Sequence, residues 1–334
     1  LKPDWTIVSF EPNSSCAMGL GAVQMRVGAN LTVLFEGLGE AASVAPYFEP
    51  TLAGFPLTTE GTFNRDNLGE REEPHGPSLL PGWRRERPST VRFRDWKWDL
   101  HSHLVPGVDD GAESVDDALE MLRGMHALGY TGMVLTPHVM RDLYPNTPAT
   151  LRPAFEALER AVAEARIPVE LRLAAEYHLE PETLNLLEKG DLLTFRCADK
   201  DGAVKEVVLL EFGFHHAPNE DLVKEALFHA ATRGLVPLLA HCERYPYLHK
   251  DAGLLELWME RGGWMSVNAA SLAGAYGPET RDMAKKCMER GWVSFVCSDA
   301  HGMRHIRALE TLSTSKTVAR WVASGQSLHP GLGT

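Results

Sequence analysis

The chain has 334 residues, is 44% hydrophobic and carries a formal net charge of −12 at pH 7. The length suits one α/β domain of about 200–250 residues with additional chain, and the composition is that of a globular protein. The acidic balance argues against nucleic acid or an anionic membrane surface as the main partner, because both favour basic patches. It still allows an anionic substrate held by metal ions, since a local site can oppose the global charge.

The cysteines and the N-terminus indicate a reducing compartment. The cysteines are odd in number and scattered without a CxxC pair, so no disulfide framework is expected. The start, "LKPDWTIVSF", does not have the pattern of a signal peptide, and no apolar run reaches the roughly 18 residues of a membrane helix. We therefore expect a cytoplasmic protein without membrane insertion.

Residues 1–95 show neither a sustained helical period nor a sustained strand period. Residues 50–92 are rich in proline, glycine and charge, which is typical of a linker or of disorder. A small accessory unit and a misassigned start are alternatives, but we favour an irregular extension without an assigned function. The rest of the chain is predicted to form one domain at 96–325 and a tail at 326–334.

From residue 96 onward, short β-rich runs alternate with amphipathic helical patterns. The clearest helix spans 114–129, with Ser114 as the expected N-cap and Gly129 at its end, and another spans 219–234. Repeated β-then-α units imply a parallel sheet with helices outside, and seven units favour a barrel over an open sheet. The predicted strands span 96–101, 132–137, 169–176, 204–212, 235–241, 264–269 and 292–299.

Six of the seven predicted strands end in a side chain of a metal-ligating type, and the seventh ends near Asn268. In barrels the active site lies at the C-terminal ends of the strands. Two of the six ends carry two such residues, separated by a single residue. In an extended segment this spacing places both side chains on one face. The residues at these six ends are His101, His103, His138, Glu176, Glu211, His241, Asp299 and His301.

Imidazole nitrogens and carboxylate oxygens are the usual ligands of zinc, manganese and iron. A lone histidine is more often packed or exposed than metal-bound, whereas a carboxylate that ends an apolar strand, such as Glu176 or Glu211, is costly unless paired or metal-bound. Chance poorly explains such residues at successive strand ends. Because carboxylates can bridge ions, the set predicts two or three metal ions, which suit hydrolysis of a phosphoester.

Three further residues lie near these strand ends. Asp110 in "VDDG" is expected to be a ligand or a partner of a ligand, although the same residues also make a good turn. Arg244 follows His241 in "AHCERYPY", and Arg304 follows His301 in "SDAHGMRH". A guanidinium fork matches phosphate oxygens, so both arginines are candidates for phosphate contact, with a surface ion pair as the alternative.

The motifs "DLHSHLVPGVDDG", "TPHV", "AAEYH", "LLEF", "AHCERYPYL", "VNAASLAGAYG" and "CSDAHG" occur in this order. Together they resemble the polymerase-and-histidinol-phosphatase (PHP) superfamily, and more closely its bacterial tyrosine-protein phosphatases of the CpsB/YwqE type. The resemblance covers residues 98–310. The run "PGVDDGAES" before a helix and the "HxERY" block are its specific parts, because His-x-His alone marks only the superfamily.

The resemblance implies a distorted (β/α)7 barrel with two or three divalent ions, Mn²⁺ first and iron or zinc as alternatives. It implies hydrolysis of phosphotyrosine by a metal-bridging hydroxide, typically on the tail of a bacterial tyrosine kinase that controls capsule or exopolysaccharide synthesis. A homo-oligomer is left open. Catalytic roles fall to Arg244, Arg304 and His301. The implied metal ligands are His101, His103, Asp110, His138, Glu176, Glu211, His241, Asp299 and His301.

The chain departs from the family pattern in two places. The 95 residues before the domain have no counterpart in the resemblance. Family members usually carry an arginine several residues past the Asp-x-His, often before prolines, whereas "SDAHGMRHIRAL" is shorter and has no prolines. Arg304 or Arg307 is therefore expected to substitute for that arginine.

Four rival functions can be compared with this one. A cysteine phosphatase needs a C-x5-R loop, but Arg304 lies seven positions after Cys297 and Leu248 occupies the required place after Cys242, so this class is rejected. A small-molecule phosphoesterase of the histidinol-phosphatase type would use the same metal set and differ only in the pocket. The acidic balance disfavours a PHP nuclease. An inactive metal-binding scaffold is the non-enzyme alternative, although it need not keep every ligand.

Overall fold

The computed structural model describes residues 23–27, 31–35, 91 and 93–329. The chain divides into two units, Leu1–Gly61 and Thr62–Thr334. In the first unit, β1 (Val23–Val27) pairs antiparallel with β2 (Leu31–Phe35), so the segment predicted to be irregular contains one hairpin. Residues 50–92 were predicted to be a linker or disordered, and all of them except Val91 lie outside the described residues.

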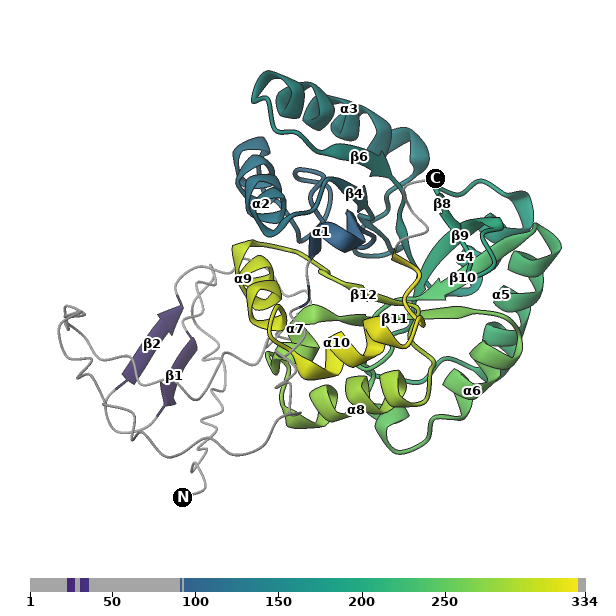
Figure 1. Ribbon diagram of the computed structural model, residues 1–334. Coiled ribbons are helices and arrows are strands. Elements are labelled where there is room, and N and C mark those ends of the chain that lie inside the picture. The colour runs from purple at the N-terminus through teal and green to yellow at the C-terminus, as the bar shows by residue number, and fades with distance from the viewer. Residues whose placement is uncertain (1–22, 28–30, 36–90, 92, 330–334) are drawn as a thin grey trace, which may run out of the picture. The chain divides into compact units, whose positions relative to one another are not determined.

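The second unit is built on a curled, mostly parallel sheet (Figure 1). One part has the strand order β3-β4-β6, and the other has the order β12-β11-β10-β9-β7-β5. Its strands are β3 (Trp98–Asp99), β4 (Gly132–Leu135), β5 (His138–Val139), β6 (Glu170–Leu173), β7 (Glu176–His178), β8 (Phe195–Ala198), β9 (Val204–Glu211), β10 (Leu235–Leu239), β11 (Trp264–Asn268) and β12 (Phe295–Cys297).

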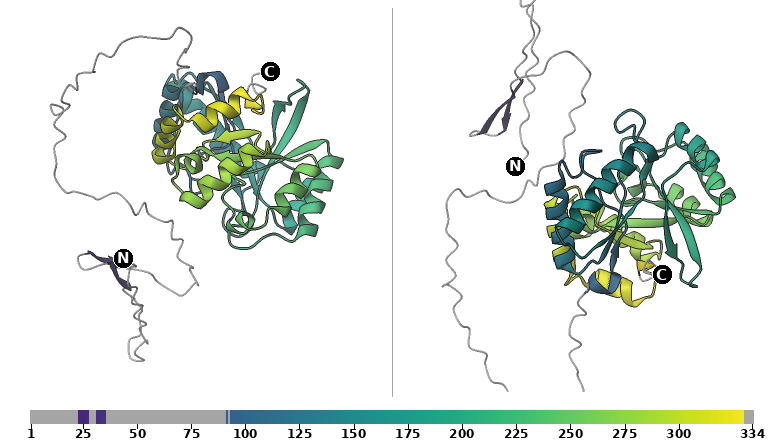
Figure 2. Two further views of the ribbon diagram at one scale, coloured as in Figure 1. Left: turned by 60° about the horizontal axis from the view of Figure 1, so that its bottom comes forward. Right: turned by 90° about the horizontal axis from the view of Figure 1, so that it is seen from above.

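Helices cover the outer face of this curled sheet, as Figures 1 and 2 show. The predicted α/β alternation is therefore confirmed. The helices are α1 (Phe93–Trp96), α2 (Val115–Leu128), α3 (Pro148–Glu164), α4 (Pro181–Lys189), α5 (Glu220–Thr232), the 3₁₀ turn η1 (Pro246–His249), α6 (Gly253–Glu260), α7 (Ala269–Ala273), α8 (Pro278–Glu289), α9 (Met303–Leu312) and α10 (Lys316–Ala323).

Hydrogen bonds just beyond the strand ends connect the first strand to the last. Ser102, after β3, forms a parallel bridge with Ala300, after β12. The backbone N–H of Asp299 donates to the carbonyl of His101 at 2.9 Å. The sheet therefore closes on itself as a distorted barrel, and the ends of the first and last strands lie side by side.

One strand that the sequence predicts as continuous is interrupted, and another ends early and is followed by a further strand. The segment predicted at 169–176 forms β6 and β7, and the chain after β4 resumes as β5. Pairing continues across the gap, because the N–H of Ala174 donates to Leu135 O at 2.8 Å and that of Glu176 to Pro137 O at 3.1 Å. After the interruption, β5 and β7 belong to the sheet path that contains β9, whereas β4 and β6 belong to the path that contains β3. The strands β5 and β7 carry site residues.

The first predicted strand, 96–101, is wrong at its start. Trp96 belongs to helix α1, and Lys97 adopts a left-handed conformation with φ 63° before β3 begins. The ring of Trp96 is buried against the aromatic side chains of Phe93 and Trp321. Tertiary packing thus overrides the β-propensity of the tryptophan-rich run. Strand β8, which pairs antiparallel with β9, has no counterpart in the sequence prediction.

The helix boundaries follow the predicted capping signals. Ser114 is the N-cap of α2 and accepts from the N–H of Asp117 at 3.2 Å, and Gly129 ends the helix with φ 110°. Asn219 caps α5, whose left-handed Gly234 follows one residue after the C-cap. Local signals therefore determine where these two helices begin and end.

A small interior core lies beneath the strand ends, on the sheet face away from the helices. It includes Val207 and Leu209 of β9, whereas Val208 and Leu210 pack in the larger core with the helices. Because side chains alternate along a strand, Glu211 shares the inner face with Val207 and Leu209. Ala174 and Phe295, which belong to the same core, precede Glu176 and Asp299 closely along the chain. These carboxylates thus lie above an apolar plug that supports them from below.

The C-terminal segment packs at the opposite end of the strands. The N–H of Leu328 donates to Ser294 O at 3.0 Å, and the N–H of Val296 donates to Nε2 of His329 at 3.1 Å. His329 is fully buried and stacks on Trp96 at 4.3 Å. The start of the predicted tail at 326–334 is therefore part of the packed unit, and residues 330–334 lie outside the described residues.

No helix within the described parts of the chain has the length and apolar character needed to cross a membrane.

A candidate metal centre at the strand ends

The structure brings all nine sequence-predicted ligands together. They form four overlapping groups in which the candidate ligand atoms lie within 4.8 Å of one another. These groups are His103–Asp110–His138–His301, His101–His103–Asp299, His101–Glu176–His241 and His138–Glu176–Glu211. Because His101, His103, His138 and Glu176 each belong to two groups, neighbouring ions could share ligands.

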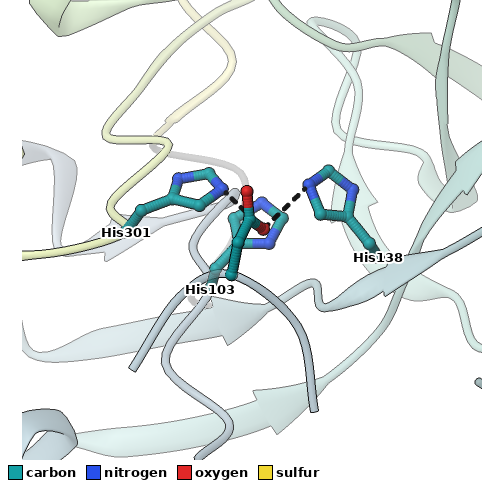
Figure 3. A group of neighbouring side chains, drawn as sticks. His103, His138 and His301 are labelled. Atoms are coloured by element: carbon teal, nitrogen blue, oxygen red, sulfur yellow. Dashed lines mark ion pairs between the residues drawn. The ribbon is translucent and has the colours of Figure 1, made fainter. Parts of the chain in front are cut away.

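One group lies at the mouth of the site, where Figure 3 shows the rings of His103, His138 and His301 converging. The Oδ1 atom of Asp110 is 3.5 Å from Nε2 of both His138 and His301. The rings of His103 and His301 stack with centroids 3.9 Å apart. Nearly half of the Asp110 side chain is exposed, so this group faces solvent while the others are buried.

Glu176 lies at the centre of the buried groups. Its Oε2 is 3.2 Å from His101 Nε2 and 3.0 Å from His138 Nδ1, and its Oε1 is 3.0 Å from His241 Nε2. The Nε2 atoms of His101 and His103 also face each other at 3.1 Å. A carboxylate whose two oxygens face different histidines is well placed to bridge two ions.

Unpaired buried atoms provide the test of whether a cation fits here. Glu211 is 1% exposed, and neither carboxylate oxygen accepts a hydrogen bond from any residue that the structure describes. The nearest ring nitrogens are 3.5 Å away in His138 and His178, and 3.7 Å away in His241. A buried carboxylate without such bonds is costly unless a cation is bound, so the residues fit a metal.

Three carboxyl groups of the site are held in their ionised form. Burial acts to raise the pKa of Glu176 and Asp299, but the surrounding histidines, led by His101, together outweigh it, and both pKa values lie well below the ordinary range. For Asp110, burial is outweighed by the hydrogen bond to His301 together with the neighbouring histidine charges, which lower the pKa to about 2. The site therefore concentrates negative charge that a divalent cation would balance.

The histidines respond to the same charges. Burial acts to lower the pKa of His138, as does His103, but Glu176 and Glu211 outweigh both and raise it to about 9. Burial is likewise outweighed at His103, where the Asp109 carboxylate raises the pKa well above its usual value. Protons and metal ions thus compete for the same nitrogens.

Two of the candidate ligands have a backbone conformation that ordinary residues rarely adopt. His241 has φ 30° and Asp299 has φ 47°, and each follows a strand directly or closely. Strain of this kind persists only where the surroundings enforce it, and it clusters at functional sites. Regular strand alternation would place the side chain of His241 on the sheet face opposite that of Ala240. The left-handed conformation of His241 breaks this alternation.

The two predicted arginines differ in position. Nη1 of Arg244 donates to Oδ2 of Asp299 at 3.1 Å, and a quarter of the Arg244 side chain stays exposed. It therefore lies beside the cluster and is accessible to an anion. Arg304 is exposed in the first turn of α9, and its charge lowers the pKa values of Tyr276 and His305 after larger effects of burial and other groups.

Several residues support the site in roles that were not predicted from the sequence. Asp109, which the sequence places in the same turn as Asp110, accepts from the N–H of His138 at 3.0 Å and lies 2.8 Å from Nδ1 of His103. Asn268 donates through Nδ2 to Oδ2 of Asp299 at 2.5 Å. The doubled aspartate and the asparagine at the seventh strand end were the available signals. His178, which is not among the predicted ligands, also lies beside Glu211.

The cysteines that the structure describes provide no nucleophile. All four cysteines among the described residues are buried: Cys197, Cys242, Cys287 and Cys297. Burial raises the pKa of Cys197 to about 12, and it raises that of Cys297 well above the ordinary thiol value. A nucleophilic cysteine needs the opposite shift, so the rejection of a cysteine phosphatase agrees with the structure. Cys16 lies outside the described residues.

Comparison with known protein families assigns most of the second unit to one family. A family model described as capsular polysaccharide synthesis, CpsB/CapC, matches residues 97–326. The chain belongs to the CpsB/CapC family. The match begins before the first site strand and ends inside the C-terminal segment that packs beneath the barrel, so it covers every residue of the candidate metal centre.

Named relatives of this CpsB/CapC protein are tyrosine-protein phosphatases. YwqE of Bacillus subtilis is 29% identical over 206 residues, which is 62% of this chain and 78% of YwqE. CpsB of Streptococcus pneumoniae is 24% identical over 210 residues, which is 61% of this chain and 83% of CpsB.

A solved structure matches the same region. It comes from the crystal structures of YwqE from Bacillus subtilis and CpsB from Streptococcus pneumoniae, described as unique metal-dependent tyrosine phosphatases. The match has a TM-score of 0.56 at 26% identity and covers 69% of this chain and 96% of that chain. The predicted PHP-type fold is therefore confirmed.

Proposed function

We propose that the protein is a metal-dependent protein-tyrosine phosphatase. The observation that carries the proposal is the set of nine clustered candidate ligands, with the buried, hydrogen-bond-free carboxylate of Glu211 among them. Arg244 lies beside the cluster with part of its side chain exposed. The names of the relatives and of the solved structure support phosphotyrosine as the substrate.

The four groups would hold two or three divalent ions, with Mn²⁺ as the proposed metal and iron or zinc as alternatives. Divalent ions supply Lewis-acid stabilisation of phosphate charge and a bound water that is acidic near neutral pH. The mixed histidine and carboxylate donors suit these borderline metals better than a site made only of oxygens.

Residues of the chain would bind the substrate and assist departure of the leaving group. Arg244 would exchange its bond to Asp299 for a phosphate oxygen and hold the substrate by a charge-assisted hydrogen bond. The departing phenolate oxygen would be stabilised by a bound cation, or protonated by His301 at the exposed mouth where this residue binds no ion. Arg304, exposed in the first turn of α9, would be the second candidate for contact with the phosphate. Catalysis would then depend mainly on positioning and electrostatic stabilisation.

The physiological substrate would be the phosphotyrosine tail of a bacterial tyrosine kinase that controls capsule or exopolysaccharide synthesis. The family description and the names of the relatives support this part of the proposal. We propose a cytoplasmic location because such kinase tails are phosphorylated there. A homo-oligomer is compatible with this function and would be measured by light scattering.

The experiment is hydrolysis of a phosphotyrosine peptide by protein treated with a chelator, with and without added Mn²⁺. His101→Ala removes a ligand of two groups and should abolish the metal-dependent rate. His126→Ala is the matched control, because His126 lies on α2 and contacts only the carbonyl of Tyr130 among the contacts seen. It should retain the wild-type rate.

Turnover that survives both chelation and His101→Ala would overturn the metal mechanism. Metal-dependent turnover of a small phosphate ester such as histidinol phosphate, without turnover of the peptide, would instead identify a small-molecule phosphoesterase. Metal binding without turnover of either compound would indicate an inactive scaffold. Iodoacetamide should leave the rate unchanged, because the described thiols are buried.

A further inference from the structure

Arg244 contacts two aromatic rings. Its guanidinium lies 4.3 Å from the ring centroid of Tyr276 and 4.8 Å from that of Phe214. Its Nη1 also donates to Asp299 at 3.1 Å. Contacts with two rings and a carboxylate restrict the rotamers of the side chain, and an oriented guanidinium fork matches phosphate oxygens.

Tyr276 is itself fixed by a second contact. Its hydroxyl oxygen lies 3.4 Å from Nε2 of His305, which is a buried residue of α9. The N–H of His301 donates to Nδ1 of His305 at 3.0 Å. An imidazole nitrogen that accepts a hydrogen bond carries no proton, so the ring proton of His305 lies on Nε2 and points to the tyrosine oxygen.

These contacts connect residues from three separate segments of the chain. They lead from Asp299 to Arg244, on to Tyr276 and His305, and back to His301, two residues after Asp299. Two of the five residues are candidate metal ligands. The arginine is thus tied to the metal cluster at both ends of the path, before any substrate is bound.

We propose that Tyr276 is a positioning residue for Arg244, which its ring holds at the edge of the metal cluster in the orientation that binds a phosphate monoester. The inference rests on the proposed function, because it assigns phosphate binding to Arg244. Burial raises the pKa of Tyr276 to about 12, so the hydroxyl stays protonated at neutral pH and adds no negative charge that would repel phosphate.

The test is calorimetric binding of inorganic phosphate to the full chain loaded with Mn²⁺, which needs no turnover. Because the ring contact exists before phosphate binds, its loss lowers affinity through lost orientation of Arg244, and Tyr276→Leu should weaken phosphate binding at least about fivefold. Tyr276→Phe keeps the ring and should stay within about threefold of wild type. With phosphotyrosine peptide, Tyr276→Leu should raise KM by the same factor and change kcat little.

A double-mutant cycle separates positioning from a general structural role. In an Arg244→Ala background, Tyr276→Leu should have no further effect on phosphate affinity. Trp292→Leu is the matched control, because it removes a ring that stacks on Arg290 before β12, away from the strand ends that carry the site. It should leave phosphate affinity unchanged. Tyr276→Met serves if the leucine variant does not fold.

Wild-type phosphate affinity in Tyr276→Leu would overturn the inference. An equal loss in the presence and absence of Arg244 would overturn it too, since the ring would then act independently of the arginine. Protein that binds phosphate in a Tyr276-dependent way but does not hydrolyse the peptide would contradict the proposed function and still support the role of Tyr276.

Discussion

At the scale of single residues, two buried glutamates at neighbouring strand ends differ in what satisfies them. Oε1 of Glu243 accepts from Ser271 Oγ at 2.5 Å and from the N–H of Asn268 at 2.9 Å. Glu211 accepts no hydrogen bond from the described residues. One carboxylate thus holds the chain's own backbone through one of its oxygens, whereas the other has only ion pairs with histidines at 3.5–3.7 Å and leaves both oxygens free to bind a cation.

This difference leads to different effects of the same substitution. Glu211→Leu should reduce Mn²⁺ affinity at least about tenfold but cost the metal-free protein little, because Glu211 accepts no hydrogen bond from the described residues and has only ion pairs of 3.5–3.7 Å with histidines. Glu243→Leu should destabilise the metal-free protein by about 1–3 kcal/mol, because it leaves two donors unpaired. Metal titration and urea unfolding measure both. Destabilisation of metal-free Glu211→Leu would contradict the assignment.

At the scale of elements, the loop between β3 and α2 explains the "PGVDDG" motif. The backbone N–H groups of Gly111 and Ala112 donate to Asp109 and to the carbonyl of His103, at 3.0 Å and 2.9 Å. A Cβ atom on Gly111 would lie 1.9 Å from that His103 carbonyl oxygen. Glycine therefore allows the aspartate loop to fold directly against the histidine strand.

Gly111→Ala should displace Asp109 and Asp110 from the histidines and lower Mn²⁺ affinity at least about tenfold. Gly302→Ala is the matched control, because this glycine lies just after His301, has extended backbone and has no described atom within 4 Å of an added Cβ. It should bind Mn²⁺ like wild type. Equal metal affinity in both variants would show that the close approach has no functional role.

The C-terminal segment is the second element with a testable property. His329 is buried between Trp96 and the start of β12, and burial lowers its pKa from 6.5 to about 3. Between these values the unfolded chain binds a proton that the folded chain does not. The contribution of His329 to the free energy of unfolding is therefore complete above its pKa in the unfolded chain. It is lost as the pH falls toward its pKa in the folded protein.

The free energy of unfolding should accordingly rise with pH between about pH 4 and 6, with a contribution from His329 of about 1.4 kcal/mol per pH unit. His329→Gln should remove this part of the slope. Urea unfolding of metal-free protein at several pH values measures it, and metal-free conditions keep ion binding out of the comparison. An identical slope in the variant would mean that His329 is exposed or protonated in the folded protein.

At the scale of the whole molecule, the metal centre lies where the barrel closes. Its candidate ligands come from the first strand end, with His101, through Glu176 in the middle, to the last strand end, with Asp299. Bound ions would therefore connect parts of the chain that are far apart in sequence. The protein is expected to depend on metal for global stability as well as for activity.

Mn²⁺ at a hundredfold excess over its dissociation constant should stabilise the fold by about 2.7 kcal/mol, and a chelator should reverse the effect. Differential scanning calorimetry with and without Mn²⁺ measures this as a rise in Tm. His101→Ala should show a much smaller rise, while His126→Ala should match wild type. A Tm that does not respond to Mn²⁺ in wild type would contradict a resident metal.

The sequence by itself determined the α/β alternation and the identity of the candidate ligands. Strand and helix periods, together with caps such as Ser114 and Gly129, are local properties that can be found along the chain. Because parallel strands place their C-terminal ends at one edge, residues such as Glu176 and Glu211 could be grouped from their positions at successive strand ends alone. The resemblance in the "PGVDDG" and "HxERY" blocks added the family.

Only the tertiary structure decided which side chains meet. Trp96 forms a helix instead of a strand because its ring packs on Trp321, more than two hundred residues later. The contact of Tyr276 with Arg244, and the absence of hydrogen bonds to Glu211 among the described residues, depend on atoms that distant segments contribute. Such partners follow from packing in three dimensions, whereas periodicity and spacing report only on the neighbourhood along the chain.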